Sequence, residues 1–180
     1  MNPPTSDPQE ILRTRARALA RTAETAPEAG AMLDLLEFRL AQERYAIETR
    51  FVQEVQPLRD LTPLPGTPSF VRGIVNLRGR ILPVFDLKKF FDLPEQGITD
   101  LHQIVFVRAG GEIELGLLAD ITVGVRHIPL GRLQPSLPTL TGIRAEYLQG
   151  VTDEPLIVLD LARILSDPKI VVEESAESLS

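Results

Sequence analysis

The sequence contains no cysteine and only two histidines in 180 residues. Without cysteine, a disulfide framework, a thiolate zinc site and a cysteine nucleophile are all excluded. The two histidines, His102 and His127, lie among aliphatic residues of predicted strands and form no motif with a serine, aspartate or glutamate. They also lack the spacing of paired metal ligands on one helical face. We therefore predict no catalytic residue, no metal site and no cofactor, and we expect neither histidine to have a functional role.

The chain also lacks an excess of basic residues and any long apolar run. Its formal net charge is −6 and its pI is near 5.0, whereas a protein that mainly binds nucleic acid needs a positive face to neutralise phosphates. No stretch approaches the roughly 18 to 20 apolar residues of a membrane span, and the arginine-rich start is not followed by a signal-peptide core. We expect a cytoplasmic protein with protein or small-molecule partners, no nucleic acid and no membrane insertion.

The first segment, residues 1–31, differs from the rest of the chain. Asp7 is a predicted N-cap and Pro8 a first helical residue, so the sequence predicts a helix over Pro8–Ala23. One face of this helix carries a basic stripe of Arg13, Arg17 and Arg21. A proline-and-glycine linker follows at 26–30. A solvated helix on a flexible tether is the favoured interpretation, and docking to an acidic partner or a membrane surface is the alternative.

From Met32 onward the pattern is that of short strands. Apolar residues alternate with polar ones through 32–40, a polar turn follows, and "YAIETRFVQEV" from Tyr45 resumes extended structure, which predicts a β-hairpin. "RILPVFDL" is a further strand that runs into a helical turn, "KKFFDLP". After a polar connection, two more strands are joined through Gly110-Gly111. That pair is typical of a hairpin turn, because a phosphate-binding loop needs a lysine and a following helix that are absent here.

An internal repeat connects the two halves of this region. "YAIETRFVQEV" at Tyr45 matches "LGLLADITVGV" at Leu115, and "FVRGIV" at Phe70 matches "YLQGVT" at Tyr147. "ILPVFDLKKFF" matches "PLIVLDLARIL", which aligns Asp86 with Asp160. The second copy lacks three residues between its glycine and its strand. Only the first copy therefore contains the tetrapeptide Asn-Leu-Arg-Gly.

The repeat and the hydrophobic content of 43% predict two related β lobes in an all-β fold with short helices. Many short strands with turns rich in proline and glycine favour small barrels, because closure removes exposed sheet edges. We expect an N-terminal extension at 1–31, one domain at 32–168 and an acidic tail at 169–180. Within the domain the lobes span about 32–96 and 100–168, and an exchange of strands between them is left open.

Glu54 and Arg78 are the two charges that most need a partner. Glu54 lies in "VQEV", where Val52 and Val55 indicate a buried surface nearby, and Arg78 lies between two glycines, Gly73 and Gly79, at which turns are expected. Because an unpaired ion buried among apolar strands costs several kcal/mol, we predict that the two side chains pair. A structural clamp and a binding-surface pair are equally compatible with the sequence.

Taken together, several segments resemble the CheW family of chemotaxis coupling proteins. They are "VQEV" with the proline-bearing loop after it, "TPSFVRGIVNLRGRILPVFDLKKFF", "LGLLADITVGVRHI" and "YLQGVTDEPLIVLDLARIL", and they cover about Leu33 to Leu165. The resemblance implies two five-stranded SH3-like barrels around a shared apolar seam.

The resemblance also implies a non-catalytic adaptor that joins the cytoplasmic tips of chemoreceptors to the regulatory domain of a CheA-type histidine kinase. It implies recruitment to membrane receptor arrays and a place in two-component signal transduction. A stand-alone regulator that caps or sequesters the kinase is the alternative. The residues carried over as partner-binding are Val52, Glu54, Gly73, Asn76, Leu77, Arg78 and Gly79.

Overall fold

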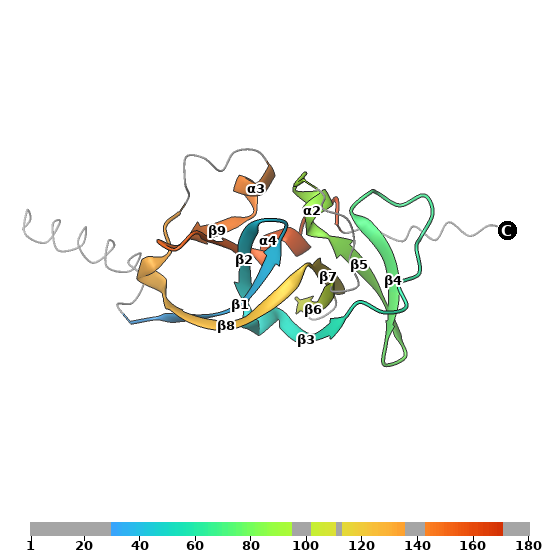
Figure 1. Cartoon of the computed structure of the whole chain (residues 1–180), viewed down its shortest axis with the longest axis horizontal. Coiled ribbons are helices and arrows are strands. Elements are labelled where there is room, and N and C mark those ends of the chain that lie inside the picture. Colours follow the sequence, from blue (N-terminus) through green and yellow to red (C-terminus); the bar gives the residue numbers. More distant parts are fainter. Residues whose placement is uncertain (1–29, 95–101, 111–112, 136–142, 171–180) are drawn as a thin grey trace, which may run out of the picture.

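The computed structural model describes residues 30–94, 102–110, 113–135 and 143–170 (Figure 1). The predicted helix at Pro8–Ala23 and residues 171–180 of the acidic tail lie outside the described residues. No helix among the described residues is long and apolar enough to cross a membrane.

The elements are short and mostly strands. The first half contains β1 (Met32–Leu40), β2 (Glu43–Glu48), the 3-10 helix η1 (Thr49–Phe51), β3 (Val52–Pro57), β4 (Val71–Leu77), β5 (Arg80–Asp86) and α2 (Leu87–Phe90). The second half contains β6 (Gln103–Ala109), β7 (Ile113–Ala119), β8 (Ile121–Pro129), the 3-10 helix η2 (Leu130–Arg132), α3 (Ile143–Glu146), β9 (Leu148–Val151), β10 (Leu156–Leu159) and α4 (Leu161–Leu165).

The strands form two five-stranded sheets, each built from both halves of the chain. Lobe A has the order β8-β1-β2-β10-β9, and lobe B has the order β3-β6-β7-β5-β4. The lobes are therefore not the successive segments 32–96 and 100–168. The hairpin β1–β2 of the first half pairs with β8 and β10 of the second half, and the hairpin β6–β7 of the second half pairs with β3 and β5 of the first half. Figure 1 shows the two lobes on opposite sides of a centre that contains α2 and α4.

The strand order is that of a structural repeat. Each strand of lobe A has an equivalent in lobe B that lies five strands earlier or later in the chain. Strands β8, β1, β2, β10 and β9 correspond in this way to β3, β6, β7, β5 and β4, and the order within the sheet is the same. The one parallel pairing of each lobe also matches, since β10 runs parallel to β2 and β7 runs parallel to β5. The predicted all-β class with two five-stranded SH3-like lobes is confirmed.

The aspartates that the repeat aligns cap the two equivalent helices. The Asp86 carboxylate accepts a hydrogen bond from the Lys88 backbone N–H at 2.9 Å, and Asp160 accepts one from the Arg163 N–H at 3.0 Å. Each bond satisfies one of the N–H groups that a helix start leaves without a partner. The strand-to-helix corner is thus fixed in the same way in both copies.

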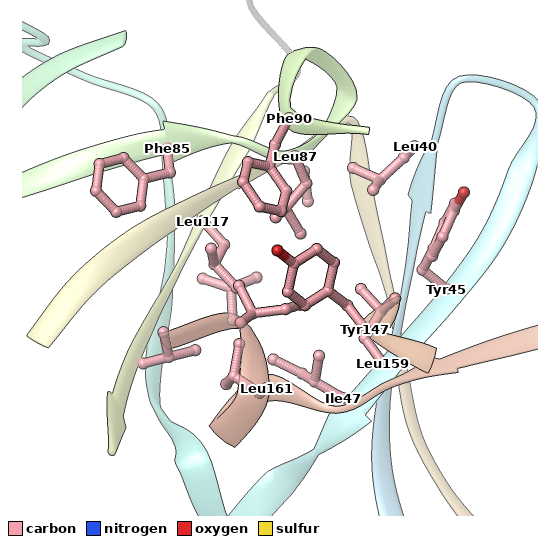
Figure 2. Close-up of a cluster of buried hydrophobic side chains, with 14 of the residues drawn as sticks. Leu40, Tyr45, Ile47, Phe85, Leu87, Phe90, Leu117, Tyr147, Leu159 and Leu161 are labelled. Atoms are coloured by element: carbon pink, nitrogen blue, oxygen red, sulfur yellow. The ribbon is translucent and has the colours of Figure 1, made fainter. Parts of the chain in front are cut away.

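The largest apolar core lies between the lobes. Neighbouring residues of one strand point to opposite faces, so β6 sends Val105 and Val107 to this seam while Ile104 and Phe106 fill the interior of lobe B. Figure 2 shows the Tyr147 ring pointing to Phe90, with ring centroids 5.3 Å apart. Smaller clusters fill the lobes, with Leu35, Ala46, Leu156 and Val158 in lobe A and seven residues, including Leu77, in lobe B.

Candidate partner-binding site

The Asn-Leu-Arg-Gly tetrapeptide forms the tip of the β4–β5 hairpin. Leu77 pairs with Arg80 across the strands, so Arg78 and Gly79 are the two turn residues. Both have positive φ, 51° and 85°, as in the tight turns that match the twist of a hairpin. The Asn76 Oδ1 accepts a hydrogen bond from the Gly79 N–H at 2.7 Å, and the Leu77 side chain is buried in lobe B. Asn76 and Leu77 therefore hold the turn, and Arg78 is presented to solvent.

The predicted pairing of Arg78 with Glu54 is confirmed. The Arg78 Nη2 lies 2.8 Å from the Glu54 Oε2, which joins the hairpin tip to β3. Of the two interpretations left open by the sequence, the structure favours the surface pair, because the side chains are 77% and 22% exposed. The Gln56 side-chain amide also donates to Glu54. An exposed cation is therefore held in a defined position beside a small pocket of about 100 Å³ whose lining includes Leu77, Phe106 and Glu114.

Gly73 lies at a β-bulge within β4, and the turn predicted there is wrong. The register between β4 and β5 shifts between Val71 and Gly73, and Gly73 is buried with φ of 147°. A Cβ atom at this position would lie 2.2 Å from the Thr62 carbonyl oxygen. Gly73 thus permits the 62–63 segment to lie against β4, and it presents no side chain to a partner.

Val52 is the first residue of β3 and is only partly exposed. It packs against the apolar seam between the lobes. Of the seven predicted partner-binding residues, the structure brings Glu54 and Arg78 into contact and places Asn76 and Gly79 in the same exposed turn. Gly73 and Leu77 are buried.

Both histidines contact an aspartate, which the sequence did not indicate. The buried His102 Nε2 lies 2.9 Å from an Asp120 carboxylate oxygen that also lies 2.5 Å from the Lys88 Nζ. His127 Nδ1 lies 2.5 Å from Asp34 on the surface. Within the described residues, no group of three or more histidines and carboxylates is arranged to hold a metal ion.

Known proteins are similar to this chain in sequence and in fold. The CheW-like domain family matches residues 34–169. This chain belongs to that family. The chemotaxis protein CheW of Treponema pallidum is 33% identical over 142 residues, which cover 76% of this chain and 84% of the relative. The protein FrzA of Myxococcus xanthus is 36% identical over 155 residues, which cover 83% of this chain and 91% of the relative.

A solved structure of this family has the same fold. The scaffolding protein TtCheW from Thermoanaerobacter tengcongensis matches with a TM-score of 0.68 and 31% sequence identity, over 77% of this chain and 96% of that chain. The chain is therefore a chemotaxis coupling adaptor of the CheW-like family. These relatives do not favour the alternative of a regulator that caps or sequesters the kinase.

This CheW-like chain also exposes an apolar surface that the sequence pattern did not indicate. Ile121, Val123 and Val125 on β8 are 50%, 55% and 55% exposed. They alternate with half-buried residues, and β8 is an edge strand of lobe A. The alternation in "ITVGV" showed a strand with two unlike faces. The sequence could not show that its apolar face is the one exposed to solvent.

Proposed function

We propose that the chain is a non-catalytic cytoplasmic adaptor that binds chemoreceptor cytoplasmic tips and the regulatory domain of a CheA-type histidine kinase. The observation that carries this proposal is the exposed apolar row of Ile121, Val123 and Val125 on β8. Isolated exposed apolar residues are ordinary, whereas contiguous ones mark surfaces that bind a partner. Membership of the CheW-like family supports a chemoreceptor tip and a histidine kinase domain as the partners.

The receptor tip is the partner we assign to the apolar row. A helical hairpin presents apolar side chains every three to four residues, and such a row suits an apolar surface flanked by polar groups. In Figure 1, β8 and β3 lie along the lower side of the molecule and lead into different lobes. A helix that crosses this side can contact the β8 row, Val52 at the start of β3, and the Arg78–Glu54 pair. The partner-binding role of Val52, Glu54, Asn76, Arg78 and Gly79 belongs to this proposal.

The adaptor proposal is tested by reconstitution with purified proteins. The full chain, the receptor tip and the kinase regulatory domain from the same cell are mixed in pairs and together, and analysed by size-exclusion chromatography with light scattering. We expect both binary complexes and a ternary complex in which the chain binds both partners at once. A chain that binds neither partner contradicts the proposal. A chain that binds the kinase domain but not the receptor tip supports the capping regulator instead.

A further inference from the structure

Lobe A contains a buried carboxylate at a position where lobe B has an aromatic ring. Glu37 pairs with Ala46 in the β1–β2 hairpin, and Phe106 pairs with Gly116 in the equivalent β6–β7 hairpin. The Glu37 side chain is only 2% exposed. It shares its face of β1 with Leu35, which belongs to the small apolar cluster of lobe A.

Two arginines neutralise this carboxylate and leave a positive charge over. The Arg44 Nε lies 2.6 Å from one Glu37 oxygen, and the Arg126 Nε lies 2.5 Å from the other. The hydrogen bond from Arg44 is the main reason that the pKa of Glu37 lies below its ordinary value, so this carboxylate is ionised at neutral pH. One negative charge between two guanidinium groups gives a net charge of +1.

The remaining charge is met by an exposed carboxylate of the chain itself. Glu154, in the connection between β9 and β10, accepts a hydrogen bond from the Arg126 Nη1 at 2.9 Å and is 69% exposed. The pKa of Glu154 is lowered, first by that hydrogen bond and then by the charges of Arg126, Arg44 and Arg132. Glu154 therefore lies in the field of three cations on the surface of lobe A.

A pocket opens beside this contact. Its volume is about 260 Å³, and its lining includes the cations Arg126 and Arg132, the carboxylates Asp153 and Glu154, and the apolar Leu156. The exposed ends of both arginines thus border a hollow that a side chain from another molecule can enter.

Stability does not account for this arrangement. Replacing a buried ion pair with apolar residues of similar volume is often neutral or stabilising, and lobe B fills the equivalent position with Phe106. An exposed pair such as Arg126–Glu154 contributes little to stability because water screens it, so little is lost when a different carboxylate takes the place of Glu154. The buried Glu37 holds Arg126 in one position, and the exposed Glu154 is a partner that exchanges easily.

From this geometry we infer that the pocket at Arg126 and Arg132 receives an aspartate or glutamate side chain of a second protein, which displaces Glu154 from Arg126. This inference rests on the proposed adaptor function, and we assign the carboxylate to the kinase regulatory domain. Val125, the end of the receptor row nearest the pocket, is adjacent to Arg126 in β8 and points to the opposite face of the strand. A receptor tip on that row therefore leaves the pocket open to a different partner.

The test uses the full chain and isothermal titration calorimetry against the kinase regulatory domain and, separately, the receptor tip. Glu154→Gln removes the competing charge from an exposed side chain, so the fold is preserved and we expect kinase-domain binding to tighten three- to tenfold. Asp153→Asn is the matched control, because Asp153 is an exposed carboxylate that also lines the pocket but contacts Gln134 and not Arg126, so it does not occupy the position that the incoming carboxylate takes. We expect it to change the dissociation constant less than twofold. Neither substitution should change receptor-tip binding.

A second pair of variants removes the cations of the pocket instead of its carboxylate. Arg126→Gln should weaken kinase-domain binding at least fivefold, and Arg132→Gln, which removes an exposed cation without touching Glu37, should weaken it by a smaller factor. Circular dichroism melts show whether Arg126→Gln folds, and Glu154→Gln and Arg132→Gln decide the question if it does not. Unchanged kinase binding in Glu154→Gln, or an equal gain in Asp153→Asn, overturns the inference. If the unmodified chain binds neither partner, it is the adaptor function that fails.

Discussion

The Arg78 guanidinium and the Glu54 carboxylate lie 2.8 Å apart and join the tip of the β4–β5 hairpin to the edge strand β3 of lobe B. The arginine is mostly exposed, and its backbone has a φ of 51° that non-glycine residues seldom adopt. The pair therefore orients a cation in solvent, and its contribution to the free energy of unfolding is that of a surface ion pair.

A double-mutant cycle measures this contribution. Glu54→Ala, Arg78→Ala and the double variant are compared by urea unfolding, and we expect a coupling free energy of about 0 to 1 kcal/mol because the pair is screened by water. The coupling should also fall when the salt concentration is raised. A coupling of roughly 3 kcal/mol or more is the value for a buried pair, and it would contradict the exposed geometry.

Gly73→Ala should destabilise the protein far more than an ordinary surface change. The new methyl group would lie 2.2 Å from the Thr62 carbonyl oxygen, and the φ of 147° is strained for any side chain. We expect a loss of about 2 to 5 kcal/mol in urea unfolding from strain and overpacking together. Gly66→Ala is the matched control, because Gly66 has a φ of 78° with open space around it and should lose about 1 to 2 kcal/mol. Equal losses in the two variants would rule out the close contact with Thr62.

Much of the fold could be predicted from local pattern and repetition. The hairpin from Met32, the strand that leads to Asp86 and the alignment of Asp86 with Asp160 depend on short-range chemistry that the sequence displays directly. The exchange of the hairpins β1–β2 and β6–β7 could not be derived in this way. The two copies have the same strand order, so the repeat alone does not show which hairpin enters which lobe.

The candidate site was predictable to a smaller degree. A carboxylate and an arginine among apolar neighbours indicated the Glu54–Arg78 contact, but not that the arginine lies in solvent. Glu37 is the opposite case, a charged residue whose burial the sequence pattern did not indicate. In "LLEFRL" it alternates with Leu36 and Phe38 and reads as a solvent-facing residue, whereas β1 has both faces buried, one in the seam and one in lobe A. Burial on the second face depends on long-range strand pairing, which local alternation does not report.

Tyr147 gives the protein an alkaline pH dependence. Its buried phenol donates to Asp167, and burial first, followed by that hydrogen bond, raises the pKa of Tyr147 to about 12. The unfolded value is near 10, so the native state holds the proton more tightly. This contribution is complete below pH 10 and is lost as the pH rises toward 12. We expect the unfolding free energy of the unmodified chain to fall by about 2 to 3 kcal/mol relative to Tyr147→Phe across this window. A constant difference between the two proteins from pH 9 to 12 would exclude the raised pKa.

Val123→Glu should separate receptor binding from folding. Val123 is the central residue of the exposed β8 row and is 55% exposed, so a glutamate there remains hydrated in the free chain and should change the unfolding free energy by about 0.5 kcal/mol or less. In the complex with a receptor tip the same carboxylate is desolvated against apolar side chains, which costs about 2 kcal/mol and weakens binding roughly 30-fold.

Leu64→Glu is the matched control, because Leu64 is an exposed apolar residue of a loop outside the row and should leave receptor binding unchanged. Calorimetry gives the dissociation constants for the receptor tip and for the kinase regulatory domain, and urea unfolding gives the unfolding free energy of each variant. Because the kinase domain is assigned to the pocket at Arg126, its affinity should stay within twofold in Val123→Glu. Equal weakening of both partners in a folded variant, or unaltered receptor binding, would show that the receptor tip does not lie on the β8 row.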